Sequence, residues 1–105
     1  MRRVVVTGMG IVSSIGNNIQ EVLASLREAK SGIRAAADYA ARGFRCQVHG
    51  EPQIIPEDVV DKRVMRFMGE GSGWNYIAMD QAVNDSGLEK AEVSNERTGL
   101  IMGSG

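Results

Sequence analysis

The sequence predicts an α/β fold, and three observations indicate it. Residues 2–7 are predicted as a strand, because they contain the β-branched run VVVT of the kind found in central strands that are covered on both faces. A glycine-rich turn follows this run and leads into a helix pattern. A second short apolar run, at residues 98–102, leads into another glycine segment. Strands and helices in this order are typical of α/β proteins with a parallel sheet.

Length and composition limit the chain to one small domain. It has 105 residues, of which 43% are hydrophobic, so it can form a core. The 12 basic and 13 acidic residues leave a net charge of -1, which does not indicate nucleic acid as a partner. No apolar run approaches the roughly 20 residues of a membrane span or the about 7–15 of a signal-peptide core. We therefore expect a cytoplasmic protein that binds neither nucleic acid nor membrane.

The first helix is predicted at residues 19–30. Asn18 is a suitable N-cap, and Glu21 lies three residues later, as in a capping box. Four apolar residues then repeat at helical spacing: Ile19, Val22, Leu23 and Leu26. Gly32 is predicted to end the helix in the left-handed conformation.

Residues 33–57 have a less regular pattern. We expect a short helical turn at residues 38–41 and a short strand at residues 44–48. Pro52 and Pro56 exclude a long central strand between them. We therefore expect this stretch to run over the surface of a larger protein.

Two helices are predicted in the second half of the chain. Pro56 and the acidic residues after it favour a helix over residues 56–68. The glycines of residues 69–73 interrupt it, and a second helix is expected at residues 72–86, with Gly87 as its C-cap. A polar connection follows at residues 89–97. Because two core strands make a poor covered sheet, we interpret residues 1–105 as the front part of a larger enzyme.

Metal and disulfide chemistry have little support in the sequence. Cys46 is the one cysteine, so no intramolecular disulfide can form, and His49 is the one histidine. Together they offer two of the four ligands that a structural zinc usually takes. We therefore predict no metal site, and we expect Cys46 to be a structural thiol.

The glycine segment after the first run allows a nucleotide-binding alternative. Gly8 and Gly10 begin the G-x-G-x-x-G pattern of dinucleotide sites, but Ser13 stands where the third glycine belongs, and Gly16 comes too late. The second strand that would carry an acidic ribose ligand is also missing. The other interpretation is that these glycines let the backbone turn tightly at the edge of a sheet.

Taken in order, blocks along the whole chain resemble one enzyme family, the β-ketoacyl-acyl carrier protein synthases. The blocks are VVTGMGIVSSIG at residues 5–16, LREAKSGI at 26–33, RFM at 66–68 with MDQAVNDSGL at 79–88, and RTGLIMGSG at 97–105. Residues 15–18 and 21–28 look most like the type I synthases of bacteria. The resemblance implies a thiolase-like fold, of which residues 1–105 would be the N-terminal part of the first α/β half.

The resemblance also implies a reaction. Synthases of this family extend acyl chains by a decarboxylative Claisen condensation between an acyl thioester and malonyl-carrier protein, usually as homodimers. They need no metal or nucleotide cofactor for this chemistry. The family uses one cysteine nucleophile and two histidines, and neither Cys46 nor His49 matches them. Residues 1–105 alone are therefore predicted to have no catalytic residues and no activity.

A basic cluster is the candidate binding site. Lys62, Arg63 and Arg66 fall within one arc of the helix predicted at residues 56–68. The resemblance assigns these cations, together with Arg45, to the surface that docks the acidic acyl carrier protein. The alternative is an ordinary solvated basic face.

Two other functions remain open on the sequence. The chain could be a non-catalytic fragment that binds carrier protein through the same cations. It could also be a nucleotide-binding oxidoreductase domain, which Ser13 and the missing second strand disfavour.

Overall fold

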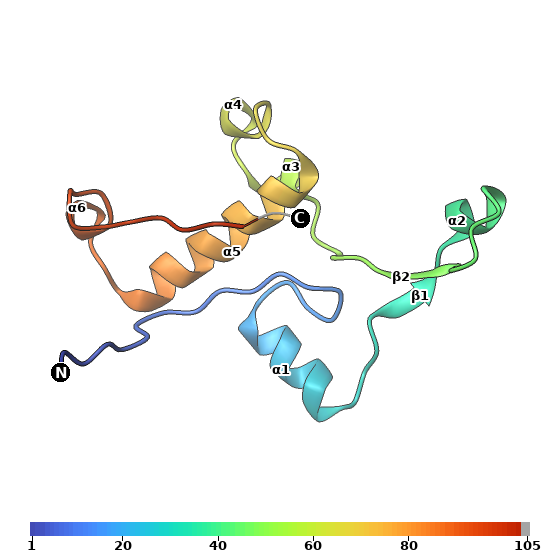
Figure 1. Cartoon of the computed structure of the whole chain (residues 1–105), viewed down its shortest axis with the longest axis horizontal. Helices are drawn as coiled ribbons and strands as arrows, with labels where there is room; N and C mark the ends of the chain where they lie inside the picture. The colour runs from blue at the N-terminus through green and yellow to red at the C-terminus, as the bar shows by residue number, and fades with distance from the viewer. Residues whose placement is uncertain (104–105) are drawn as a thin grey trace.

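The structure, a computed structural model, describes residues 1–103 and is organised around one long helix, α5 (Figure 1). The elements in chain order are α1 (Ile19–Arg27), β1 (Ile33–Ala35), α2 (Ala37–Ala41), β2 (Val48–Gly50), α3 (Pro56–Val59), α4 (Lys62–Met65), α5 (Glu70–Ser86) and α6 (Lys90–Val93). Residues 104–105, the end of the predicted glycine segment, lie outside the described residues.

The core lies where α3 and α4 pack near the start of α5. Val60, Met65 and Ile77 are its buried residues, each with 7% or less of its surface exposed. Pro56 packs so closely on Gly73 that a Cβ at the glycine would lie 2.5 Å from the proline ring. The indole Nε1 of Trp74 donates to the Ile54 carbonyl at 3.0 Å, which ties the chain before α3 to α5.

Helix α1 begins as predicted and ends earlier. The Asn18 side chain accepts a hydrogen bond from the Glu21 amide at 3.0 Å, so Asn18 is the N-cap. The Glu21 carboxylate accepts from the Asn17 amide at 2.7 Å, one residue before the position expected for a capping box. The left-handed residue after the helix is Ala29, with φ of 52°, and not Gly32.

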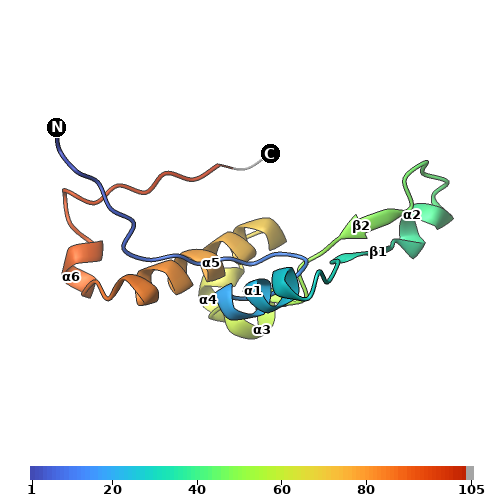
Figure 2. The ribbon, with the colours of Figure 1, turned by 90° about the horizontal axis from the view of Figure 1, so that it is seen from below.

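Residues 33–50 form a separate arm. Strands β1 and β2 pair antiparallel, with Ile33 opposite Gly50 and Ala35 opposite Val48, and α2 lies between them in the chain. Figures 1 and 2 both show this arm at one end of the molecule, away from α6. The predicted helical turn is confirmed as α2. The strand predicted at residues 44–48 begins only at Val48, because the chain before it folds back onto α2.

The single helix predicted at residues 56–68 is wrong, because the chain forms two short helices there. Val60 has an extended backbone with ψ of 140° and is buried in the core. Asp61 then starts α4, since its side chain accepts a hydrogen bond from the Arg63 amide at 2.8 Å. Burial of Val60 and capping by Asp61 therefore divide the helix.

Helix α5 is longer than predicted, and the next connection is more ordered. It begins at Glu70 and so contains Gly71, which was expected to precede it. It ends at Gly87, whose φ of 69° confirms the predicted left-handed cap. Helix α6 lies inside the predicted polar connection and has a reciprocal capping box between Glu89 and Glu92.

The two predicted core strands are wrong for this structure. Residues 2–7 and 98–102 are not in strands, and their apolar side chains are exposed, with Val4 at 93% and Ile101 at 96%. The sheet formed by residues 1–103 is the two-stranded antiparallel pair of the arm. The radius of gyration, 16.9 Å, exceeds the roughly 13 Å of a compact domain of this length. The described structure therefore contains the helices of an α/β arrangement without its parallel sheet.

Candidate functional site

The glycine segment lies directly against α5. The sides of Gly8 and Gly10 that would carry a Cβ face the carbonyl oxygens of Ala82 and Ala78, too closely for any side chain. Neither glycine has a positive φ, so close approach, and not a turn, requires them. The small residues on both sides let an extended backbone lie on the helix.

Hydrogen bonds fix this segment in register with α5. The Met9 amide donates to the Asp85 carboxylate at 2.9 Å, and the Ile11 amide donates to Gln81 Oε1 at 3.1 Å. Amides two apart in an extended chain are separated by roughly the same distance as side chains four apart on a helix. Gln81 also donates to the Asn17 carbonyl at 2.7 Å. The space that a pyrophosphate would need beside Gly8 and Gly10 is thus taken by α5, which argues against the nucleotide-binding alternative.

The predicted basic cluster lies on α4 and its C-cap. Lys62 and Arg66 are one turn apart on the same side, and the Arg66 amide donates to the Lys62 carbonyl at 3.2 Å. Arg63 points differently, because its guanidinium contacts the Asp61 carboxylate at 3.4 Å. Its side chain is 88% exposed, so this ion pair is well solvated. The structure therefore separates the Lys62–Arg66 pair from Arg63.

Phe67 gives Arg66 a defined position. The guanidinium carbon of Arg66 lies 4.5 Å from the centre of the Phe67 ring, within the range of a cation–π contact. Phe67 is 77% exposed, so the pair is on the surface. Beside it lies a groove of about 420 Å³, lined by Glu57, Lys62, Met65, Arg66 and Met68. This corner therefore combines two neighbouring cations, of which Arg66 is held against a ring, with apolar surface.

Arg45 is on a different part of the molecule. It lies in the loop between α2 and β2, at the far end of the arm, and both views place this loop away from α4 (Figures 1 and 2). The structure thus places Lys62, Arg63 and Arg66 on or next to α4, with Arg63 turned toward Asp61, and leaves Arg45 apart from them.

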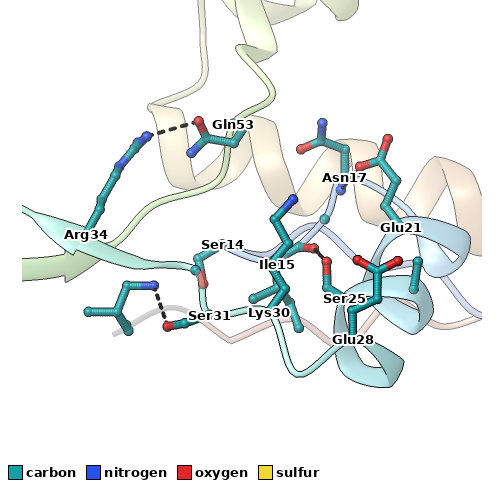
Figure 3. Close-up of a pocket in the computed structure, with 14 residues that line it drawn as sticks. Ser14, Ile15, Asn17, Glu21, Ser25, Glu28, Lys30, Ser31, Arg34 and Gln53 are labelled. Atoms are coloured by element: carbon teal, nitrogen blue, oxygen red, sulfur yellow. Dashed lines mark hydrogen bonds between the residues drawn. The ribbon is translucent and has the colours of Figure 1, made fainter.

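A polar recess of about 480 Å³ lies at the base of the arm (Figure 3). Ser14, Lys30, Ser31, Arg34 and Gln53 are among its lining residues. The Arg34 guanidinium donates to Gln53 Oε1 at 3.0 Å across it. The Arg34 charge is also paired with Glu51, so the arginine of this recess between arm and body already has partners.

The remaining chemical residues are on the arm. Cys46 is exposed, and its thiol lies 3.4 Å from the Val48 carbonyl. His49 Nε2 lies 3.9 Å from the Glu51 carboxylate, and its ring contacts Tyr39 edge to face. Among residues 1–103, no three His, Cys, Asp or Glu side chains are grouped as a metal site. No helix in the same range has the length and apolar character to cross a membrane.

Sequence reasoning missed two residues of the α4 surface. Asp61 precedes Lys62 directly, and an aspartate before a basic run is an N-cap signal that could have divided the predicted helix. The contact between Arg66 and Phe67 has no such signal, since neighbours in a helix rarely face each other.

The chain belongs to the family described as the beta-ketoacyl synthase N-terminal domain, which it matches over residues 1–105. It is 47% identical over 105 residues to 3-oxoacyl-[acyl-carrier-protein] synthase 1 of Haemophilus influenzae and 48% identical over 106 residues to the Escherichia coli protein of that name. It is 34% identical to 3-oxoacyl-[acyl-carrier-protein] synthase 2 of Coxiella burnetii. All of this chain is covered in the first two matches and 99% in the third. The chain spans about a quarter of the length of these curated relatives (26%, 26% and 25%).

Proposed function

We propose that this chain is the N-terminal segment of a type I β-ketoacyl-acyl carrier protein synthase with a thiolase-like fold. The observation that carries the proposal is identity near one half, along the whole chain, to two proteins named 3-oxoacyl-[acyl-carrier-protein] synthase 1. The greater identity to synthases named 1 than to one named 2 supports the type I assignment. The complete enzyme would work in the cytoplasm as a homodimer.

The reaction proposed for the complete enzyme is a decarboxylative condensation of an acyl thioester with malonyl-carrier protein. Loss of carbon dioxide from the malonyl group leaves a carbanion, which attacks the acyl thioester carbon and forms the new C–C bond. Such a step needs an activated nucleophile to hold the acyl group and stabilised oxyanions. Cys46 and His49 lie on the exposed arm, where they have no such arrangement. We therefore assign residues 1–105 a binding role and no catalytic one.

In this proposal, the α4 surface binds acyl carrier protein. Lys62 and Arg66 line a groove together with Met65 and Met68, which suits an acidic helix with apolar residues between its carboxylates. Opposite charges of this kind steer the encounter and fix the orientation of the partner. Arg63 has part of its charge balanced by Asp61, so its contribution should be smaller.

The binding test compares charge reversals on two exposed helices. Arg66→Glu should weaken binding of purified acyl carrier protein at low salt by about tenfold, because a contact between opposite charges becomes repulsive. The matched control is Lys90→Glu, an exposed cation at the start of α6. Equal affinity of wild type and Arg66→Glu would overturn the docking surface.

A condensation assay separates the enzyme from the fragment alternative. Residues 1–105 that bind carrier protein without forming a 3-oxoacyl product fit both the segment role proposed here and a non-catalytic fragment. Product formation by an enzyme made of this chain followed by the remaining three quarters of the Escherichia coli relative would favour the synthase. An inactive but folded fusion would favour the fragment.

A further inference from the structure

The one histidine of the chain lies in the paired strands of the arm. The register of β1 and β2 places His49 directly opposite Arg34. Side chains at such positions share one face of the strand pair, with Cβ atoms about 5 Å apart. Arginine side chains stay charged in proteins. A proton on His49 therefore puts two positive charges on neighbouring side chains, an arrangement that destabilises a strand pair unless a negative charge balances it.

Glu51, the residue after β2, supplies that negative charge. One of its carboxylate oxygens, Oε2, lies 2.5 Å from the Arg34 guanidinium and 3.9 Å from His49 Nε2. The contact with His49 becomes an ion pair only when the ring gains a proton. A single carboxylate oxygen then contacts both cations and attracts each of them at short range. Protonation of His49 thus adds one attraction to Glu51 and one repulsion from Arg34.

The His49 ring also contacts helix α2. Tyr39 lies edge to face against it, with ring centres 5.5 Å apart, and Tyr39 packs in the same way on Phe44 at 5.6 Å. The His49 side chain is 26% exposed, so its ring is partly enclosed by these neighbours. Tyrosine side chains are neutral near pH 7. Among residues 1–103, the charged or titratable groups that face His49 are therefore Arg34 from β1, Tyr39 from α2 and Glu51 after β2.

We propose that His49 and Glu51 form a pH-sensitive clasp that holds β1 against β2, and that Glu51 decides the direction of its response. Histidine gains its proton between about pH 8 and pH 5. In that range His49 becomes a second cation on Glu51, and the strand pair becomes more stable because the attraction acts at short range. This added stability is present at acidic pH and is lost as the pH rises above neutrality. Without the Glu51 carboxylate, the same proton faces Arg34 alone and destabilises the pair.

Hydrogen exchange at one amide of the full chain measures the opening of this clasp. The Ala36 amide donates to the Gln47 carbonyl at 2.8 Å, next to the β1–β2 pair, so its exchange requires the strands to separate. Its protection factor is divided by that of the Val60 amide, which donates to the Pro56 carbonyl in the body. This ratio should be about two- to threefold higher at pH 5.5 than at pH 7.5, a modest rise because Glu51 is 44% exposed. Carboxylates and thiols ordinarily titrate outside this range.

Two variants separate the roles of the clasp residues. His49→Phe keeps a ring against Tyr39 but takes up no proton, so its ratio should be equal at the two pH values. Glu51→Gln keeps the length of the side chain but leaves protonated His49 opposite Arg34 without a counter-charge. Its ratio should therefore be about twofold lower at pH 5.5 than at pH 7.5, the reverse of the wild type. The matched control is Glu96→Gln, at an exposed glutamate after α6, which should keep the wild-type rise.

Equal wild-type ratios at the two pH values would refute the clasp, and a rise that persists in His49→Phe would refute His49 as its source. A rise that persists in Glu51→Gln would refute the deciding role of the carboxylate. If Glu51→Gln leaves the Ala36 amide without protection, Arg34→Gln provides the test instead. It removes the repelling charge and keeps Glu51, so the rise on acidification should exceed that of the wild type. An equal or smaller rise in Arg34→Gln would contradict the clasp.

Discussion

Basic residues have structural supports of different kinds in the arm and in the α4 corner, which is the surface formed by Lys62, Arg66 and Phe67. The α4 corner lies over the core, where Val60 and Met65 contact Ile77 of the long helix. The arm has a small aromatic contact of its own, and Gly32 and Gly50 at its base lie against Ser14 of the body. Cations on the corner are therefore placed by tertiary packing, whereas Arg45 is placed by a short hairpin and the contacts at its base. The comparison teaches that one predicted site can depend on two structurally independent supports.

The largest expected effect comes from breaking the support of the corner. Ile77→Ala should lower the free energy of unfolding by about 3 kcal/mol, because it opens a cavity in a small core. The matched change in the arm, Val48→Ala, should cost less than about 0.5 kcal/mol, because Val48 is 50% exposed. Urea unfolding followed by circular dichroism measures both. Similar losses for the two variants would mean that the arm and the corner unfold as one equally packed unit.

Local signals explain what the sequence could predict. The Asn18 cap and the Gly87 cap act within one helical turn, and both are confirmed. The apolar stripe at residues 19–26 predicted the helix α1, which ends early, but Leu23 and Leu26 of that stripe are exposed. The strands at residues 2–7 and 98–102 depend on a neighbouring strand, which no local pattern supplies. Residues 1–103 provide none for either segment, so the valines of the first and Leu100 and Ile101 of the second stay exposed.

In the candidate site, too, local spacing could be predicted and the relative position of distant segments could not. Spacing along one helix was enough to group Lys62, Arg63 and Arg66. The distance of Arg45 from them could not be predicted, because it depends on where a hairpin leaves the body. The close approach of Gly8 and Gly10 to α5 could not be predicted either, because the sequence does not show whether a turn or close packing requires a glycine.

An intermediate loss of stability is expected where hydrogen bonds hold the N-terminal segment against α5. Gln81→Ala removes both the acceptor for the Ile11 amide and the donor to the Asn17 carbonyl, in a partly buried place. We expect a loss of about 2 kcal/mol in the free energy of unfolding, because two backbone groups lose their partners. The matched change at the arm is Arg34→Ala, which removes an exposed ion pair with Glu51 and should lower the free energy of unfolding by about 0.5 kcal/mol. Amide exchange at Ile11 should accelerate in Gln81→Ala only, and unchanged protection there would contradict the fastening role.

The smallest effect tests how the corner fixes one of its cations. Phe67→Leu keeps an apolar side chain but removes the ring under the Arg66 guanidinium, a contact worth about 0.5–1 kcal/mol at exposed sites. Because Arg66 then samples more conformations, the Kd for acyl carrier protein should rise about two- to fourfold, with little change in unfolding free energy. The effect should vanish in an Arg66→Glu background, where no cation remains to be positioned. Phe44→Leu on the arm is the matched control for losing an exposed aromatic residue. Its effect on the Kd should be the same whether Arg66 is intact or replaced. An equal loss from Phe67→Leu in both backgrounds would instead mean that the ring contacts the partner directly.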